Sequence, residues 1–598
     1  MRKQYWLKAL LLWGMFYSFS WLAEAGDRFR TYEELPLWEK PDAGQWAAVR
    51  GFNASWGSTD ERYGRTEPYQ GKRSRSLVLE GWRGERVFAQ AVLWTKEKTE
   101  DVRYVLGDLS GGGAVIPASD VEIGFVRYTV TEKLPVITDG CYHGYMNEAA
   151  SQYDSTMVAD CIDPYMEKDD MPAMSARAIW LTIPIPAHDY VGSYKGTLRI
   201  FSGSRELAAL RLEVRSNRRI LPEPSAWNFH LDLWQNVFTI ARDYGVAPFS
   251  QEFYAIVGPY LKRLAAAGQK AITAPILHGP WGVNSGSAGN FLSLIEWIRH
   301  VGGEWEFDYS VFDEYVQFAM DCGIQGQISC YTLAPWGYQY RYFDVATNSY
   351  KNWVLRPEHK DCEEVLSVFV KDFAAHLRSK GWFGKAAIAF DERPLEDMKN
   401  IIRIIHAVEP DFKISQAGFD YMPEIDDAVY DYSLASYKDF PEGRTQVRRE
   451  AGKKSTYYIC CPEIRPNRYV FSDPVECTYI PYNMAVRGAD GFLCWAVFHW
   501  MGNPLLDARW TNYWSGELFM LYPGNRTSIR FEKLVEGIQD YEKMRIFRET
   551  ASASDVARLD AALEPFRETL KVKDRYNIEN RSYVPAAVHA VQKILLGQ

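Results

Sequence analysis

Asp391 and Glu392 form a pair of adjacent carboxylates at the end of an apolar run. The run, Ala386–Phe390, has the length of a buried strand, and Pro394 follows shortly after the pair. Ionised side chains cannot continue a buried strand, so the pair is expected at the strand's end. Cleavage of a glycosidic bond needs a carboxylic acid to protonate the departing oxygen and a negative group to stabilise positive charge at the anomeric carbon. The pair has the side chains for that chemistry, although a solvated turn or a helix N-cap would also explain it.

The adjacency of the pair restricts how both carboxylates reach one substrate. Neighbouring residues of a regular strand point to opposite faces, so both can face one sugar only where the pleat ends or bulges. Pro394 favours such an ending. Two crowded carboxylates in a partly desolvated site also raise one pKa, which keeps that group protonated for acid catalysis. Arg393 would oppose this shift if its side chain faced inward, because a nearby cation favours the charged form.

A long alternation of strand-like and helical segments would position this pair, and it begins after the linker Leu221–Pro224. The strand-like runs are Trp227–Trp234, Ala271–Leu277, Gln325–Leu333, Ala386–Phe390, Lys413–Ala417, Val429–Ala435, Ser455–Cys461 and Gly491–Phe498. Amphipathic helical segments between them include Gln251–Ala267, Tyr309–Asp321, Cys362–Ser379 and Leu395–Val408. Eight apolar strands that alternate with helices predict an α/β domain of the (β/α)8, TIM-barrel type over residues 225–550. A doubly wound sheet alternates in the same way, but the count of eight and the long aromatic segments after several strands favour the barrel.

The regions on either side of the barrel have different patterns. Residues 26–220 contain short alternating runs broken by Gly, Pro and Asp, such as Arg86–Thr95 and Ile179–Ile185, which predict an all-β sandwich. Residues 551–598 are mostly helical and are expected to form a C-terminal extension packed on the barrel. The predicted architecture is therefore a TIM-type barrel preceded by a β-sandwich.

Residues 1–25 have the pattern of a signal peptide. A positive region that includes Lys8 precedes the apolar stretch Ala9–Trp21, and cleavage is expected near Ala25-Gly26. An uncleaved anchor is the alternative, but the apolar run is short and ends at a cleavage-like site. No later segment approaches the ~18 uninterrupted apolar residues of a membrane span. We therefore expect an exported protein, periplasmic or extracellular, with no membrane span in the mature chain.

The composition narrows the class of partner. The net charge of -9 gives no electrostatic reason to expect nucleic acid, and a neutral carbohydrate fits better. The 21 Trp, 37 Tyr and 30 Phe are a large aromatic stock for stacking on sugars. Aromatic side chains are also ordinary core residues of β-rich folds, so this observation alone decides little. The oligomeric state cannot be read from the sequence.

Neither disulfides nor a metal site is expected to organise the fold. Nine cysteines leave at least one unpaired, and only Cys141 and Cys161 look like a pair. The ten histidines show no HExxH pattern, no helical i,i+4 pair and no clustering with Cys or Asp at ligand spacing. No glycine-rich nucleotide loop follows a strand. We therefore expect no metal and no cofactor.

Three motifs carry a resemblance to a known family: the pair Asp391-Glu392, the stretch Gly491–Ala496 leading to His499-Trp500, and the segment from Leu521–Gly524 through Ser528–Arg530 to Glu536–Glu542. Together they resemble glycoside hydrolase family 123, whose members are β-N-acetylgalactosaminidases with a β-sandwich before the barrel. The last motif is the most specific of the three. The chain departs from the family at one point, because members often continue the carboxylate pair with proline, whereas here Arg393 precedes Pro394.

The resemblance implies a retaining, substrate-assisted mechanism, in which the sugar's own 2-acetamido oxygen attacks the anomeric carbon and no covalent enzyme intermediate forms. It implies that Glu392 acts as general acid and then as base. It implies that Asp391 orients the acetamido group and stabilises the oxazolinium-like intermediate. This route is a recognised exception to the two-carboxylate scheme. The implied activity is removal of terminal β-linked N-acetylgalactosamine from a glycan or glycolipid.

Further side chains at the predicted strand ends are candidates for substrate binding, because an acetamido sugar needs apolar walls and hydrogen-bonding groups. They are Trp234 after the first strand, His278 after the second, Tyr331 at the end of the third with Trp336 behind it, Tyr437 after the sixth, and Trp495, His499 and Trp500 on or after the eighth. Ordinary packing also explains each aromatic, and a structural role also explains each histidine.

Two other functions fit the same pattern. A barrel of this build with altered loops would cleave a different glycoside, because fold and family speak to the reaction type more strongly than to the substrate. An inactive barrel would serve as a carbohydrate-binding or adhesion protein. The carboxylate pair argues against that second alternative, since a binding module does not need a protonated acid beside an anion.

Overall fold

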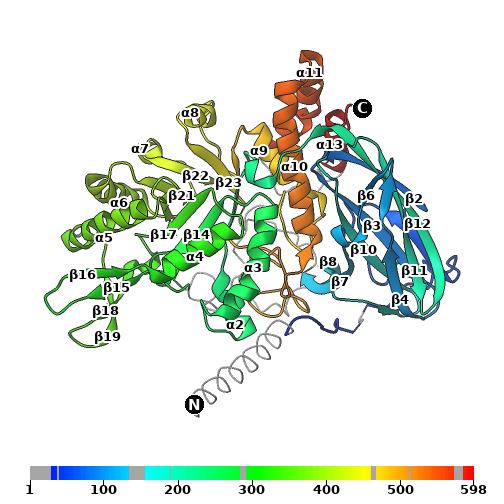
Figure 1. Ribbon diagram of the computed structural model, residues 1–598, viewed down its shortest axis with the longest axis horizontal. Coiled ribbons are helices and arrows are strands. Elements are labelled where there is room, and N and C mark those ends of the chain that lie inside the picture. Colours follow the sequence, from blue (N-terminus) through cyan, green and yellow to red (C-terminus); the bar gives the residue numbers. More distant parts are fainter. Residues whose placement is uncertain are drawn as a thin grey trace, which may run out of the picture.

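The computed structural model describes residues 28–36, 39–132, 155–188, 190–282, 291–459, 466–510, 513–571 and 584–598. The predicted signal peptide and Cys141 lie outside these residues. Figure 1 shows a body of blue and cyan strands beside a larger body of helices and strands in green and yellow. None of the described helices is both long and apolar enough to cross a membrane.

The N-terminal body is the predicted β-sandwich of two sheets. One sheet has the order β1 (Phe52–Gly57), β3 (Arg86–Thr95), β10 (Ser175–Pro184), β7 (Glu122–Glu132), β8 (Ser155–Asp163) and β25 (Thr527–Ser528). The other has the order β2 (Ser76–Arg83), β12 (Arg205–Ile220), β11 (Ser193–Ser202), β4 (Thr99–Leu106) and β9 (Asp169–Met171), with the short β5 (Leu109–Gly111) and β6 (Ala114–Ile116) beside β11. The strand β25 comes from the C-terminal part of the chain, so the two bodies share a sheet.

The first sheet is buried on both faces, which explains the composition of its central strands. In β3, Ala89 and Leu93 pack between the two sheets, whereas Phe88 and Trp94 join the hydrophobic cluster that continues into the barrel body. Successive residues of a strand point to opposite faces, so a strand covered on both sides is apolar at almost every position. From Val87 onward every residue of β3 is buried.

The C-terminal body is the predicted barrel. Its eight strands are parallel and follow the order β13 (His230–Leu233), β24 (Gly491–Cys494), β23 (Lys454–Tyr458), β22 (Val429–Ala435), β21 (Lys413–Gly418), β20 (Ala386–Phe390), β17 (Gln327–Tyr331) and β14 (Ala271–Pro275). The helices around it are α2 (Val237–Tyr244), α3 (Gln251–Ala266), α4 (Ser310–Asp321), α5 (Lys360–Ser379), α6 (Leu395–Val408), α7 (Pro423–Asp426), α8 (Arg444–Glu450), α9 (Val475–Val486) and α10 (Ile529–Thr550). Three further helices follow: α11 (Ala553–Ala562), α12 (Glu564–Lys571) and α13 (Val584–Leu595). The predicted fold class is confirmed.

Side chains close the seam between the first and second barrel strands, where the strand ladder is incomplete. The backbone N–H of Lys270 donates to the carbonyl of Leu231 at 2.9 Å. The amide of Gln269 then takes the place of a strand neighbour, because its Oε1 accepts from the backbone N–H of Leu233 at 2.9 Å and its Nε2 donates to the carbonyl of the same residue at 3.2 Å. These bonds satisfy backbone groups that an open sheet edge would leave unpaired.

The barrel interior is polar rather than filled with bulky aliphatic side chains. His230 bonds to Asp431 at 3.1 Å, and Gln327 donates to the same carboxylate at 2.8 Å. These three residues lie on β13, β22 and β17, which are not neighbours in the sheet, so the bonds cross the interior. Asp232 is also buried there, and burial together with the charge of Asp431 raises its pKa to about 7.

The loops after β14 and β17 form a second, four-stranded sheet that the sequence did not predict. Its order is β16 (Trp305–Asp308), β15 (Glu296–Arg299), β18 (Gln339–Asp344) and β19 (Ser349–Val354). Figure 1 shows this sheet at the end of the barrel remote from the sandwich, close to α5. The apolar side of the sheet packs on that helix, with Trp297 stacked on Phe369 at 4.4 Å between ring centroids.

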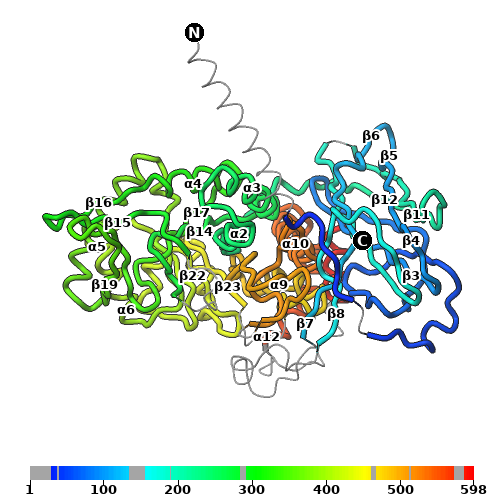
Figure 2. Tube along the Cα trace, turned by 90° about the horizontal axis from the view of Figure 1, so that it is seen from below, coloured from blue at the N-terminus to red at the C-terminus, as the bar shows by residue number. Residues whose placement is uncertain are grey.

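The helix α10 lies between the sandwich and the barrel, as both views show (Figures 1 and 2). Its N-cap is Ser528, whose hydroxyl accepts from the backbone N–H of Phe531. Arg530, in its first turn, pairs with Asp160 of the sandwich at 2.9 Å, and both side chains are buried. Neither charge can be solvated by water, so loss of one partner would leave the other charge buried and unpaired, which is strongly destabilising.

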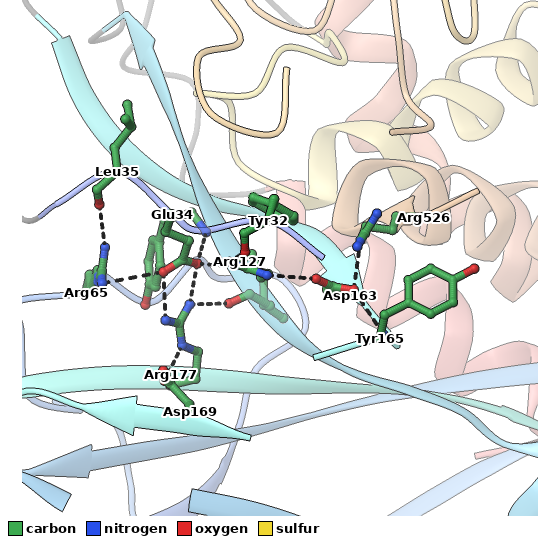
Figure 3. Close-up of polar contacts among 12 residues, drawn as sticks. Tyr32, Glu34, Leu35, Arg65, Arg127, Asp163, Tyr165, Asp169, Arg177 and Arg526 are labelled. Carbon is green, nitrogen blue, oxygen red and sulfur yellow. Dashed lines mark hydrogen bonds and ion pairs between the residues drawn. The ribbon is translucent and has the colours of Figure 1, made fainter. Parts of the chain in front are cut away.

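A second group of buried charges ties the chain's N-terminal segment to both bodies (Figure 3). Asp163 of β8 pairs with Arg127 at 3.0 Å and with Arg526 at 2.8 Å.

Cys161, two residues before Asp163 on β8, is a free, buried thiol. This observation does not favour the suggested disulfide between Cys141 and Cys161, but Cys141 lies outside the described residues, so the pairing stays a prediction.

Candidate active site

The carboxylate pair stands directly after β20. Ala387 and Ala389 pair in register with residues of β17 and β21 whose side chains face the barrel interior. Asp391 follows Ala389 by two residues, so its side chain faces the same way. Glu392 follows where the strand has ended, and Pro394 is the N-cap residue of α6. The pair is half-buried at the carboxyl end of the barrel strands. This is the end of a TIM barrel at which active sites lie.

Asp391 accepts a hydrogen bond from the indole of Trp336. The indole Nε1 lies 2.9 Å from Asp391 Oδ2. Trp336 opens the short 3-10 helix η5 (Trp336–Tyr338) in the loop after β17. Burial raises the pKa of Asp391 above its usual range, while the hydrogen bonds it accepts and the charge of Arg393 act in the opposite direction. The indole thus fixes the position of this carboxylate and favours its charged form.

Glu392 accepts a hydrogen bond from the phenol of Tyr458. The hydroxyl lies 2.5 Å from Glu392 Oε1, and Tyr458 is the last residue of β23. Burial raises the pKa of Glu392, and the negative charge of Asp391 raises it further, although the bond from Tyr458 opposes the shift. A carboxyl group that keeps its proton to higher pH is suited to general acid catalysis.

The side chain of Arg393 contacts Trp336 and the backbone of Glu392 rather than forming an ion pair with either carboxylate. Its guanidinium carbon lies 4.3 Å from the centroid of the Trp336 ring, and its Nε donates to the carbonyl of Glu392 at 2.8 Å. A guanidinium over an indole face is an attractive cation–π arrangement. The residue that interrupts the family pattern therefore holds the indole that donates to Asp391.

An aromatic cluster lies at the same end of the barrel. Trp234 is in contact with Tyr331 at 4.6 Å, with Trp281 at 5.2 Å and with Trp495 at 5.3 Å between ring centroids. Burial raises the pKa of Tyr331, and the charges of Asp232 and Asp391 raise it further, so Tyr331 lies near the carboxylate pair. Trp234, Trp281 and Tyr331 are buried and Trp495 is half-buried, so the cluster forms a packed aromatic wall at the barrel mouth.

Two further candidates from the sequence, His278 and Tyr437, contact other side chains. His278 is half-buried beside Arg341, and its pKa is lowered by burial and by that guanidinium. Tyr437 packs against Phe419 with ring centroids 5.2 Å apart. None of the contacts described for these side chains involves either carboxylate.

His499 and Trp500 are fully buried. His499 Nδ1 bonds to the side chain of Asn236. The indole of Trp500 donates to the carbonyl of Leu521 at 2.8 Å and packs near Tyr260. The structure gives both residues packing contacts within the barrel body.

Tyr458 and Trp281 are site residues that sequence reasoning missed. Tyr458 ends the seventh barrel strand and pairs in register with Ala435 and Leu493, which share its inward phase. The predicted strand Ser455–Cys461 ran past Tyr458, so the criterion of a strand end, which selected Trp234 and Tyr331, did not mark it. Trp281 lies in an irregular loop, and no periodicity marks it.

The last part of the most family-specific motif, Glu536–Glu542, lies on α10. The amide of Gln539 bonds to both the backbone N–H and the carbonyl of Arg86 in the sandwich, at 2.8 and 2.9 Å. Glu542 accepts from the backbone N–H of Phe229 at 2.7 Å. This motif therefore joins the two bodies. Within the described residues, no group of three His, Cys, Asp or Glu side chains could hold a metal ion.

A parallel eight-stranded barrel with two crowded carboxylates and an aromatic cluster at its strand ends is the architecture of a glycoside hydrolase. Comparison with known families agrees: residues 234–547 match the model of the glycoside hydrolase 123 catalytic domain, and residues 56–202 match the glycoside hydrolase 123 N-terminal domain. The chain belongs to glycoside hydrolase family 123 and is a glycosidase.

A solved structure shows the same fold. A family 123 glycoside hydrolase from Clostridium perfringens, studied for glycolipid glycan hydrolysis, is 24% identical, with a TM-score of 0.79 over 91% of this chain and 98% of its own. A family 5 xyloglucanase from Bacteroides ovatus is 9% identical, with a TM-score of 0.28 over 78% of this chain and 98% of its own. No curated protein matches the chain in sequence.

Proposed function

We propose that the protein removes terminal β-linked N-acetylgalactosamine from glycans or glycolipids by a retaining, substrate-assisted mechanism. The observation that carries this proposal is that the two carboxylates accept hydrogen bonds from different aromatic side chains. Asp391 is held by the indole of Trp336, and Glu392, whose pKa is raised by burial and by Asp391, is held by the phenol of Tyr458. The neighbouring relative from Clostridium perfringens, which acts in glycolipid glycan hydrolysis, supports the class of substrate.

In the proposed first step, the carboxyl group of Glu392 gives its proton to the glycosidic oxygen as the bond from that oxygen to the anomeric carbon breaks. The acetamido carbonyl oxygen forms the new bond to the anomeric carbon from the opposite face. Positive charge then spreads over the oxazolinium ring, and the carboxylate of Asp391 stabilises it through the acetamido N–H. The fixed position of Asp391 makes this stabilisation available without reorganisation.

In the second step, the carboxylate of Glu392 takes a proton from water as the water oxygen attacks the anomeric carbon. The bond to the acetamido oxygen breaks, and the product keeps the original anomeric configuration because two inversions have occurred. A group that serves as acid and then as base must have a pKa near the working pH. Burial and the charge of Asp391 move the pKa of Glu392 in that direction.

Hydrolysis of nitrophenyl β-glycosides tests this proposal. The protein without residues 1–25 is incubated with the glycosides of N-acetylgalactosamine, N-acetylglucosamine and galactose. We expect preference for the 2-acetamido sugars and inhibition by a thiazoline mimic of the intermediate. Release from the plain galactoside at a comparable rate would exclude participation of the acetamido group. Glu392→Gln and Asp391→Asn should each lower kcat by ~100-fold or more, as expected for loss of acid–base catalysis or of charge stabilisation.

The site of action is proposed to lie outside the cytoplasm. Residues 1–25 support this proposal, because their pattern is that of a cleaved export signal. Expression of the whole chain in a bacterial host with fractionation tests it. We expect a periplasmic or secreted product whose N-terminus, read by mass spectrometry, lies near Gly26. A full-length product retained in the cytoplasm would contradict it.

A further inference from the structure

A groove of about 850 Å³ lies between the loop after β14 and the four-stranded sheet. Its lining includes His278, Trp336, Arg341, Tyr350 and Asn352. The volume is within the range of sites that bind small molecules. One wall is Trp336, whose indole donates to Asp391, so the groove begins beside the catalytic pair.

The four-stranded sheet presents different chemistry on its two faces. Arg341 is in register with Asn352, and Phe343 with Tyr350, so these side chains share one face. The opposite face carries Trp297 and other aromatics that pack on α5. The groove therefore lies on the polar face, and Tyr350 is 53% exposed there. An exposed aromatic beside hydrogen-bonding groups is the composition of a sugar-binding surface.

Arg341 is oriented by its neighbours and keeps donors available. Its guanidinium carbon lies 4.3 Å from the centroid of the Tyr350 ring, and its Nη1 lies 3.4 Å from His278 Nε2. Burial and Arg341 lower the pKa of His278, which favours the neutral imidazole, the form that can accept from the guanidinium. Among the described residues, no carboxylate lies within ion-pair distance of Arg341. The remaining N–H groups of a guanidinium can donate to hydroxyl oxygens of a ligand.

We infer that this groove binds the aglycone, that is, the sugar residues on the leaving-group side of the scissile bond. The inference rests on the proposed function, in which the terminal sugar occupies the aromatic cluster at the barrel mouth. The rest of the glycan must then extend from the barrel mouth past Trp336. Trp336 and the polar face of the sheet line the same groove. Tyr350 stacks on an aglycone sugar, and Arg341 and Asn352 bind its hydroxyl groups.

Two substrates with the same terminal sugar test the inference. One is p-nitrophenyl N-acetyl-β-galactosaminide, which has no aglycone sugar, and the other is β-linked N-acetylgalactosamine on lactose. We expect Tyr350→Ala and Arg341→Ala to lower kcat/KM for the lactose conjugate relative to that for the aryl glycoside by about 5- to 10-fold, the effect of one stacking or hydrogen-bonding contact. Free lactose should inhibit aryl glycoside hydrolysis by the wild type more strongly than by either variant.

Lys351→Ala is the matched control, because Lys351 lies next to Tyr350 on β19 but outside the groove lining. It should leave the ratio of the two kcat/KM values unchanged. If the wild type hydrolyses both substrates but the Tyr350 and Arg341 variants leave the ratio unchanged, the aglycone site is wrong and the proposed function stands. If the wild type hydrolyses neither substrate, the proposed function falls and takes the aglycone site with it.

Discussion

Glu392 and Asp391 each accept one hydrogen bond from an aromatic side chain, and the two donors are open to separate tests. The phenol of Tyr458 stabilises the charged form of Glu392. Tyr458→Phe should therefore raise the pKa of Glu392 further, by roughly one unit for a bond worth ~1.5 kcal/mol. Because the proposed acid works in its protonated form, the alkaline limb of the pH profile of kcat/KM should move to higher pH.

Tyr457→Phe is the control for this shift, since Tyr457 lies on the same strand but on the opposite face, where its hydroxyl accepts from the backbone N–H of Phe440. That variant should leave the alkaline limb in place. An alkaline limb that stays fixed in Tyr458→Phe, or moves to lower pH, would show that Glu392 is not the acid.

Trp336→Phe removes the donor to Asp391 while keeping an aromatic ring beneath Arg393. The charged form of Asp391 loses a hydrogen bond, so its pKa should rise and its hold on the acetamido group should weaken. A hydrogen bond to a charged group is worth ~1.5–3 kcal/mol, which corresponds to a loss of about 10- to 100-fold in kcat. The loss should deepen toward low pH, where Asp391 takes up a proton.

Measured kcat values at several pH values check this prediction, with Trp353→Phe on β19 as the control. A uniform loss at all pH values would contradict the role given to the indole.

The carboxylate pair could be located from the sequence, but its hydrogen-bond donors could not. Two ionised residues after an apolar run mark a strand end by themselves. Tyr457 and Tyr458, by contrast, are adjacent, and only the register of β23 decides which one faces inward. The expected strand Ser455–Cys461 ended later than the observed Lys454–Tyr458, so alternation alone could not make that choice. The bond from Trp336 depends on a loop conformation that no periodicity encodes.

A carboxyl group buried inside the barrel leads to a prediction about the pH dependence of stability. Asp232 of β13 is buried, and its pKa of about 7 is raised by burial and by Asp431. A carboxyl group whose pKa is higher in the folded state stabilises the fold fully below its unfolded pKa and loses that contribution as the pH rises through the folded pKa. The free energy of unfolding should therefore fall as the pH rises from about 4, the usual pKa of a carboxyl group, to about 7, and level off above that.

Asp232→Asn removes this titration and keeps an oxygen for the indole of Trp234, which donates to Asp232 at 3.3 Å. Thermal unfolding at pH 5.5 and pH 8.5 tests the difference. The variant should lose less Tm than the wild type between these two values, by about 2–4 °C for each kcal/mol. Burial lowers the pKa of His230, but Asp431 and Asp232 raise it overall, so the comparison reports Asp232 together with its influence on His230. Parallel Tm changes in the two proteins would contradict the raised pKa.

Strands and helices of the barrel could be predicted, whereas the four-stranded sheet could not. The barrel strands are covered on both sides, so each appears as a short apolar run between amphipathic helices. β15 pairs with β18, and a whole barrel strand and helix lie between them in the chain. Such non-local pairing leaves no local pattern. The alternation of Arg341 and Asn352 with Tyr340 and Trp353 is visible only once these segments are known to be strands.

The sandwich and the barrel share one hydrophobic cluster and one sheet, so we expect them to unfold together. Phe88 and Trp180 of the sandwich belong to the same cluster as the barrel residues Phe531 and Val535 of α10. Differential calorimetry of the wild type should give a single transition. Two well-separated transitions would show that the shared cluster does not couple the two bodies.

The buried pair between Asp160 and Arg530 offers a direct measure of this coupling. Asp160 also accepts from Arg62 and from the phenol of Tyr522, at 2.8 and 2.7 Å. Arg530 donates in turn to the backbone carbonyl of Arg468 and to two further carbonyls of the segment before α10. Arg530→Met should lower the free energy of unfolding by about 3–5 kcal/mol, because it leaves a carboxylate buried with fewer partners.

Arg403→Ala provides the comparison, since Arg403 and Glu363 pair at 2.9 Å with both side chains about half exposed. Exposed pairs contribute ~0–1 kcal/mol, so that variant should be nearly neutral in urea unfolding. The double variant Asp160→Asn with Arg530→Met should recover part of the loss, because no unpaired buried charge remains. If Arg530→Met costs no more than Arg403→Ala, the charges at this interface do not hold the two bodies together, and the shared apolar cluster alone must do so.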